Sequence, residues 1–141
     1  MTDPVLVDAG PLVAIASSRD QYHIACVSQL QDLRPPLLTS WPVLAEATWL
    51  LRTEPVALET LCQLAVHGWL AAPPLEVADM FAWFERFCQR YAKLKPQLAD
   101  ASLVYLAERE GVDVVFTVDR RDFSIYRIGK NRAFRLLPAS V

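Results

Sequence analysis

The 141-residue sequence is poor in the residues that bind zinc. It contains three cysteines, Cys26, Cys62 and Cys88, and two histidines, His23 and His67. A zinc site needs Cys or His residues paired at short spacing, and these five stand apart. The cysteines fall within helical apolar patterns, so we expect reduced thiols in the core. A zinc-based function is therefore disfavoured.

Long apolar runs are also missing. No segment reaches the roughly 20 apolar residues that span a bilayer, and the first residues do not combine a basic region with a hydrophobic segment of signal-peptide length. We therefore expect a cytoplasmic protein that does not associate with membranes. The sequence shows no internal repeat or linker, and its length is typical of one core, so we expect a single domain over residues 1–141.

The chain has little excess charge, with a formal net charge of −2, which argues against a protein that coats nucleic acid nonspecifically. One segment near the C-terminus nevertheless holds six basic residues and one acid. Such a cluster is either a solvated face or a surface that contacts the phosphates of a polyanion. The basic residues are Arg120, Arg121, Arg127, Lys130, Arg132 and Arg135.

Two predicted strands end in aspartate. Residues 114–118 are apolar enough for a strand buried on both faces, and Asp119 follows them. Residues 5–7 form a shorter apolar run that ends at Asp8, before a helix. Ligands bind at the carboxyl ends of parallel strands, although aspartate also commonly caps a helix. Asp122 lies three residues after Asp119, so a helix there places both carboxylates on one side.

Two further acids occur on apolar faces of predicted helices. The pattern over residues 41–52 is apolar nearly all round, which predicts a buried helix, and Glu46 lies within it. Asp100 lies in the first half of a helix that ends at Gly111, on the same side as Leu103 and Ala107. A buried carboxylate needs a cation, an arginine or a shifted pKa, whereas a carboxylate at a helix end reaches solvent.

These acids are expected to converge. In a parallel sheet with right-handed crossovers, neighbouring strands present their carboxyl ends at one edge, so Asp8 and Asp119 approach each other. The helices that carry Glu46 and Asp100 can lean over that edge. Carboxylates without histidines or thiols are the ligands of a hard cation such as Mg²⁺ or Mn²⁺. The sequence therefore predicts metal-dependent hydrolysis of a phosphodiester.

At this point the residues resemble a known family. Four segments in chain order look like those of a PIN domain, and more narrowly of a VapC-like toxin, across essentially the whole chain. They are Val7-Asp8, Leu44-Ala45-Glu46-Ala47, Leu98-Ala99-Asp100-Ala101 and Thr117-Val118-Asp119-Arg120-Arg121-Asp122-Phe123.

The resemblance implies an α/β fold, a three-layer α/β/α sandwich around a central, mainly parallel sheet. It implies an Mg²⁺- or Mn²⁺-dependent endoribonuclease, with RNA as substrate, a small antitoxin protein as inhibitor and a homodimer as the expected assembly. Carried over, Asp8, Glu46, Asp100 and Asp119 are the metal ligands and catalytic residues. Asp122 is an auxiliary catalytic acid, and Thr117 is a polar support.

One departure from the family is that Ala9 and Gly10 follow the first aspartate, where many members have a hydroxyl or Asn. Two other functions stay open. One is a noncatalytic interaction module that binds partners through an exposed aromatic ridge of Trp83 and Phe87. The other is a magnesium-dependent phosphatase with Asp8 as nucleophile, although such enzymes usually carry a second acid where this chain has Gly10.

Overall fold

The fold is built on a five-stranded parallel sheet with the strand order β3-β2-β1-β4-β7 in the computed structural model, which describes residues 3–140. The strands are short, and apart from the exposed Arg135 at the start of β7 they consist of apolar residues. They are β1 (Leu6–Val7), β2 (Leu37–Leu38), β3 (Leu70–Ala71), β4 (Val114–Phe116) and β7 (Arg135–Leu137).

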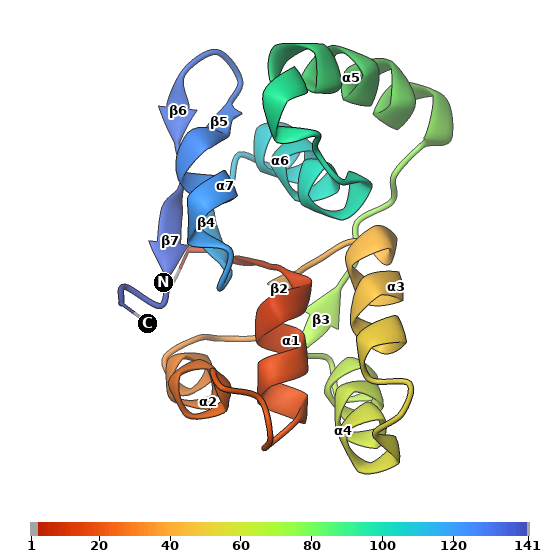
Figure 1. The fold of residues 1–141 in the computed structure, drawn as a ribbon, viewed down its shortest axis with the longest axis vertical. Coiled ribbons are helices and arrows are strands. Elements are labelled where there is room, and N and C mark those ends of the chain that lie inside the picture. Colours follow the sequence, from red (N-terminus) through yellow and green to blue (C-terminus); the bar gives the residue numbers. More distant parts are fainter. Residues whose placement is uncertain (1–2, 141) are drawn as a thin grey trace.

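Helices cover both faces of this sheet (Figure 1). The main helices are α1 (Ala9–Ala16), α2 (His23–Gln31), α3 (Trp41–Leu50), α4 (Pro55–Val66), α5 (Val77–Arg90), α6 (Leu98–Glu110) and α7 (Arg120–Ile125). A short 3₁₀ turn, η1 (Ala92–Leu94), joins α5 to α6, and a separate antiparallel hairpin of β5 (Arg127–Ile128) and β6 (Arg132–Ala133) follows α7. No helix among residues 3–140 has the length and apolar character needed to cross a membrane.

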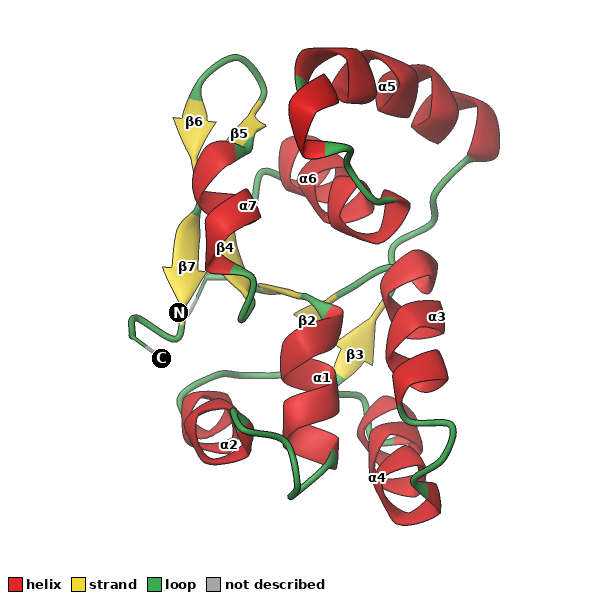
Figure 2. Ribbon diagram, in the orientation of Figure 1, coloured by secondary structure: helices red, strands yellow, loops and turns green. Residues whose placement is uncertain are grey.

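The order of the strands reverses beside β1. The chain moves from β1 to β2 to β3 in one direction, and then returns past β1 to form β4 on its other side. Because crossovers between parallel strands are right-handed, this reversal puts the later helices on the opposite face. Figure 2 shows α1, α2 and α4 on one side of the strands and α5 and α6 on the other. The predicted three-layer α/β/α arrangement is thus confirmed, and its switch point lies between β1 and β4.

Local sequence signals explain several element boundaries. Ser40 caps α3 by accepting a hydrogen bond from the backbone N–H of Val43, with Pro42 in the first turn. Gly111 ends α6 in the left-handed conformation, at φ 68°, as its position predicts. This helix begins at Leu98, two residues after Pro96, and Lys95 before that proline is not helical but left-handed, at φ 50°.

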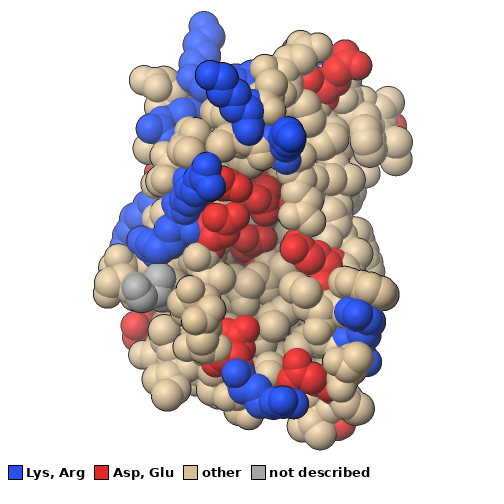
Figure 3. Space-filling view, in the orientation of Figure 1, with Lys and Arg blue, Asp and Glu red and all other residues tan. Residues whose placement is uncertain are grey.

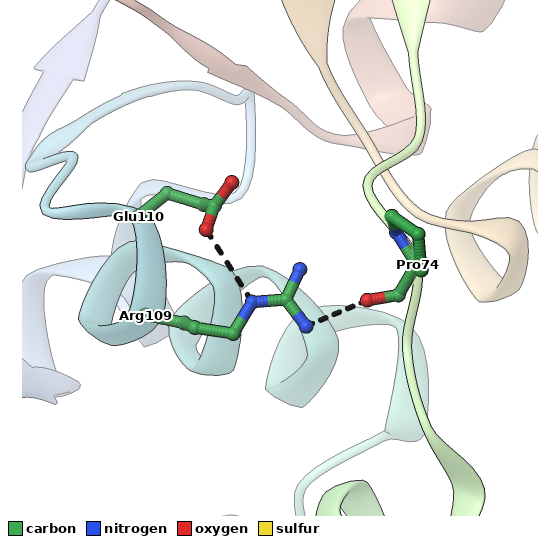
Figure 4. Close-up of polar contacts among 3 residues, drawn as sticks. All are labelled: Pro74, Arg109 and Glu110. Carbon is green, nitrogen blue, oxygen red and sulfur yellow. Dashed lines mark hydrogen bonds and ion pairs between the residues drawn. The ribbon is translucent and has the colours of Figure 1, made fainter.

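The connection between β3 and α5 is fastened to the end of α6. The Arg109 guanidinium donates to the carbonyl oxygen of Pro74 at 2.6 Å and contacts the Glu110 carboxylate at 3.4 Å (Figure 4). This crossover carries the chain back across the sheet to β4. Its attachment helps to fix α6, and therefore Asp100 on that helix, over the sheet edge.

Some expectations from the sequence were wrong. The helix predicted to be buried, α3, buries Val43 and Ala47, but Trp41 and Trp49 are 73% and 61% exposed. One face of α3 therefore packs on the core, and its other apolar residues are exposed to solvent. Strand β3 was not predicted, since its two residues carry no alternation. Cys62 is exposed and not a core thiol, whereas Cys26 is buried.

The expected exposed aromatic ridge is also wrong. Phe87 is only 5% exposed, and the ring of Trp83 stacks on it at 4.6 Å between centroids. Trp83 also contacts the ring of Tyr105 on α6, at 5.3 Å. Both aromatic residues therefore pack between α5 and the core, and only Trp83 stays partly exposed, so the two do not form the exposed ridge that an interaction module would need.

Candidate metal centre

The two strand-end aspartates lie on either side of the switch point between β1 and β4. The register pairs Val7 of β1 with Phe116 of β4, so the segments that follow these two strands leave the sheet at the same level. Asp8 then caps α1, and its Oδ1 accepts a hydrogen bond from the Ala9 N–H at 2.8 Å. Asp119 caps α7, where its Oδ1 accepts from the Asp122 N–H at 3.4 Å. Both interpretations therefore apply: each aspartate caps a helix, and each lies at the carboxyl end of a parallel strand.

A fully buried threonine joins the two strand ends. The Thr117 hydroxyl donates to Asp8 Oδ2 at 3.0 Å and accepts from the backbone N–H of Asp119 at 3.0 Å. One side chain thus orients the first carboxylate and the turn that carries the second. This geometry fits the polar support that the resemblance implies for Thr117.

Glycine at position 10 lets α1 approach this turn closely. A Cβ atom there would lie 2.5 Å from Cγ2 of Val118, which is closer than side-chain atoms can pack. Gly10 therefore has a packing reason in this chain. Its place after Asp8, which marks a departure from the family, is explained by the tight contact between α1 and the segment that leads to Asp119.

Three acids form the tightest group. Asp100, Asp119 and Asp122 each offer a carboxylate oxygen, and these atoms lie within 4.8 Å of one another. The first turn of α7 brings Asp119 and Asp122 together, and the first turn of α6 supplies Asp100. Asp122, expected as an auxiliary acid, thus lies inside this group.

The other two predicted site residues lie nearby but outside that group. Glu46 is half-buried on α3, and its charge helps to raise the pKa values of Asp8 and Asp100. Asp8 is 6% exposed, and the charge of Asp119 also contributes to its raised pKa. All five predicted acids therefore belong to one electrostatic neighbourhood, which is the convergence that the sequence predicts.

The pKa values record how unfavourable this crowding is. Burial, followed by the charges of Asp8 and Asp119, raises the pKa of Asp100 to about 8. Burial raises the pKa of Asp8 to about 6 against the opposing hydrogen bonds from Ala9 and Thr117. Burial also raises the pKa of Asp119. A shared positive charge would relieve all three.

No protein cation takes that place among the described residues. The ion pairs found across residues 3–140 are Arg109 with Glu110 and Arg132 with Asp113, and neither involves the cluster. The chemistry of the donors, oxygen atoms of carboxylates with no histidine or thiol, fits Mg²⁺ or Mn²⁺. The residues present therefore fit a divalent cation.

The basic segment after Asp119 borders the acids. Figure 3 shows acidic residues gathered near the centre of one face, with Lys and Arg side chains beside and above them. Several of these cations have structural contacts: Arg120 donates to the carbonyl of Pro138, and Arg127 donates to that of Ser124. No such contact is found for the side chains of Arg121, Lys130 and Arg135 within the described residues. Arg135 is the first residue of β7 and lies at the end of the sheet opposite to the aspartates, so phosphate contact would fall mainly to Arg121 and Lys130.

Sequence reasoning missed two buried polar features behind the acids. The hydroxyls of Ser40 and Ser102 lie 2.6 Å apart and join the start of α3 to α6. The Tyr126 hydroxyl is buried one turn after Asp122, and it has no hydrogen-bond partner among the described residues. Burial and then the charge of Asp100 raise its pKa. Only the Ser-Trp-Pro helix start at residues 40–42 gave a signal in the sequence.

With this fold and site in place, the chain can be compared with known proteins. The PIN domain family matches residues 5–131, so the chain belongs to the PIN domain family. Within it, the chain is 30% identical over 139 residues to Ribonuclease VapC26 of Mycobacterium tuberculosis (strain ATCC 25618 / H37Rv). That match covers 95% of this chain and 100% of the relative.

A solved structure has the same fold. The crystal structure of Mycobacterium tuberculosis VapC20, described as a Sarcin-Ricin loop cleaving toxin, superposes with a TM-score of 0.69 at 17% identity. The similarity covers 79% of this chain and 86% of that one. Together with the curated relative, it identifies the chain as a VapC-like PIN domain protein, as the sequence resemblance indicated.

Proposed function

We propose that this chain is a metal-dependent endoribonuclease and the toxin of a toxin-antitoxin pair. The observation that carries the proposal is the group of Asp100, Asp119 and Asp122 at the switch point of the sheet, where none of the three acids forms an ion pair among the described residues. Membership of the PIN family and the similarity to a VapC ribonuclease support the same activity. RNA is the proposed substrate, since one named relative is a ribonuclease and the other is described as a Sarcin-Ricin loop cleaving toxin.

The five acids have distinct proposed roles. The converging oxygens of Asp100, Asp119 and Asp122 are the first ligands of the cation, and Asp8 and Glu46 complete its negative surroundings. A bound Mg²⁺ or Mn²⁺ would supply Lewis acidity at this position. The chain itself orients two of the carboxylates by backbone N–H groups, that of Ala9 for Asp8 and that of Asp122 for Asp119.

Residues around the acids would position the RNA. Thr117 fixes the orientation of Asp8, so loss of its hydroxyl would misplace a carboxylate beside the cation without removing a charge. Arg121 lies close enough to lower the pKa of Asp119, against the dominant effect of burial. Its guanidinium is therefore placed at the rim where a phosphate would approach the acids.

Cleavage of RNA by purified variants tests the proposal. The parent is expected to cut single-stranded RNA with Mg²⁺ or Mn²⁺ and to lose activity in EDTA. Asp100→Asn and Asp8→Asn should cut slower by roughly 100-fold or more, the effect of removing a group that stabilises charge in the transition state. Asp113→Asn is the matched control, because Asp113 is paired with Arg132 outside the cluster. Folded Asp100→Asn protein that cuts as fast as the control would contradict the assignment.

A protein partner and a homodimer form the second part of the proposal. On α3 and α4 the side chains of Trp41, Trp49 and Val56 are exposed by 61% to 79%. Apolar groups of this size at the surface are typical of a face that another chain covers. We propose that the antitoxin or a second copy covers it, which light scattering of the free protein and of the complex would distinguish.

A further inference from the structure

A groove outside the acidic centre separates α5 from the tip of the β5–β6 hairpin. Its volume is about 340 Å³, and its walls include Trp83, Arg86 and Arg90 of α5, Glu108 near the end of α6, and Lys130 of the hairpin. Three of these five side chains are cationic. The groove therefore combines an aromatic wall with a local excess of positive charge.

Arg90 joins the two walls of this groove by hydrogen bonds. Its guanidinium donates to the carbonyl oxygen of Gly129 at 2.7 Å and to that of Lys130 at 2.8 Å. The planar fork of arginine makes two such contacts at once, which lysine cannot reproduce. The hairpin tip is thus held at a fixed distance from α5, and Lys130 is held at the rim.

Arg86 lies one helical turn before Arg90 and has no assigned structural partner. No hydrogen bond or ion pair of the Arg86 guanidinium is found among residues 3–140, and the residue is exposed. An arginine of this kind is free to bind an anion. It faces the same groove as Lys130, so the two side chains present two cations to one occupant.

The remaining wall is aromatic and contains a hydrogen-bond acceptor. Trp83 is stacked on Phe87, and its Nε1 donates to Glu108 Oε2 at 3.1 Å, which fixes the indole in the wall. The Glu108 carboxylate repels a phosphate at its end of the groove, but it accepts N–H groups from the edge of a base. Cations together with a fixed aromatic ring are the features that bind a single nucleic-acid strand.

The groove is connected to the acidic centre through packed rings. Tyr126 follows Asp122 by one helical turn, and its ring lies 5.1 Å from that of Phe87, which in turn supports Trp83. The rings of Tyr126 and Phe87 therefore lie between Asp122 and the Trp83 wall of the groove. From α7 the chain runs directly into the β5–β6 hairpin, whose tip carries Lys130 (Figure 1).

We propose that this groove is a second RNA-binding site, which holds nucleotides of the substrate away from the bond that is cut. Arg86 and Lys130 bind backbone phosphates, and a base lies against the Trp83 wall with its edge toward Glu108. The inference rests on the proposed ribonuclease function and extends it to substrate recognition. It predicts that a long RNA binds more tightly than one that fills only the acidic centre.

Binding of fluorescein-labelled single-stranded RNA, measured by anisotropy in EDTA, tests this site without cleavage. Arg86→Gln should weaken binding of an RNA of about 12 nucleotides on the order of five-fold, and lower the slope of log affinity against log salt by about 0.7. Lys130→Gln, which changes a residue in the turn of the hairpin, should weaken RNA binding and lower the salt slope by similar amounts. Arg34→Gln is the control: Arg34 is also exposed, with no hydrogen bond or ion pair found in the described part of the chain. It should stay within about two-fold of the parent.

Length dependence of cleavage gives the second readout. In Mn²⁺, Arg86→Gln should raise KM for the long RNA and leave kcat/KM unchanged for an RNA of about 4 nucleotides, which cannot reach the groove. Equal binding by Arg86→Gln and Arg34→Gln would overturn the groove proposal, whatever the cleavage result. A parent that binds RNA through Arg86 but never cuts it would instead contradict the proposed function alone.

Discussion

Replacing Asp100 by Asn should stabilise the metal-free protein, although it removes a proposed metal ligand. Asp100 is 8% exposed and lies among other carboxylates, and its pKa is raised from 3.8 to about 8. In EDTA the folded state must therefore either keep a proton on this group or accept a buried charge. Asn has nearly the same shape and no charge, so it avoids that cost.

The pH dependence has a definite sign. Below about pH 4 both the folded and the unfolded chain hold the proton, and Asp100 does not lower the free energy of unfolding. Between pH 4 and pH 8 the unfolded chain releases the proton while the folded chain retains it, so stability falls as pH rises. The part of this shift that is expressed by pH 7 corresponds to about 4 kcal/mol. Relaxation of the site and entry of water reduce such a figure, so we expect Asp100→Asn to gain about 1 to 3 kcal/mol there.

Urea unfolding in EDTA, followed by tryptophan fluorescence between pH 5 and pH 8.5, measures this difference. Asp32→Asn provides the control, since Asp32 is an exposed residue at the end of α2 and should change stability by less than about 0.5 kcal/mol. Added Mn²⁺ should reverse the ranking, because only the parent retains its full ligand set. If Asp100→Asn is no more stable than Asp32→Asn at pH 8 without metal, the electrostatic account of the cluster is refuted.

Three further substitutions probe the supports of the site. Thr117→Val removes a hydroxyl with two buried hydrogen bonds and should cost about 1 to 3 kcal/mol in urea unfolding, whereas Thr117→Ser keeps the hydroxyl and should retain most of the parent's stability. Gly10→Ala should cost a similar amount by overpacking against Val118, and Val118→Ala in the same chain should recover part of it; additive losses would show that the contact is not the cause. Arg90→Lys should speed amide hydrogen exchange in the β5–β6 hairpin and leave exchange in the central sheet unchanged.

Much of the fold could be predicted from local patterns. The apolar runs at β1 and β4, the helix start at Ser40 and the glycine at 111 each have a local physical cause, so the structure follows them. Strand β3 and the exposure of α3 could not be predicted in this way. A strand of two residues is defined by its neighbour β2, and an apolar helix face does not reveal whether the same chain or another one covers it.

The site was partly predictable for the same reason. Asp8 and Asp119 follow buried strands, and parallel topology then brings their ends together, so their proximity follows from sequence and general rules. The membership of the tightest group depends on the turn into α7 and on the tilt of α6, which no local pattern fixes. Asp122 therefore took a more central place than expected, and Glu46 a more peripheral one.

The way the acids are held explains why the cluster can attract a cation. Asp8 is oriented by a backbone N–H and by the Thr117 hydroxyl, and Asp119 by the backbone N–H of Asp122. These donors are neutral, so they fix the carboxylates without cancelling their charge. An arginine in the same place would have stabilised the fold and removed the site. The chain instead accepts raised pKa values at Asp8 and Asp100, and that unrelieved repulsion is the free energy which a divalent cation recovers on binding.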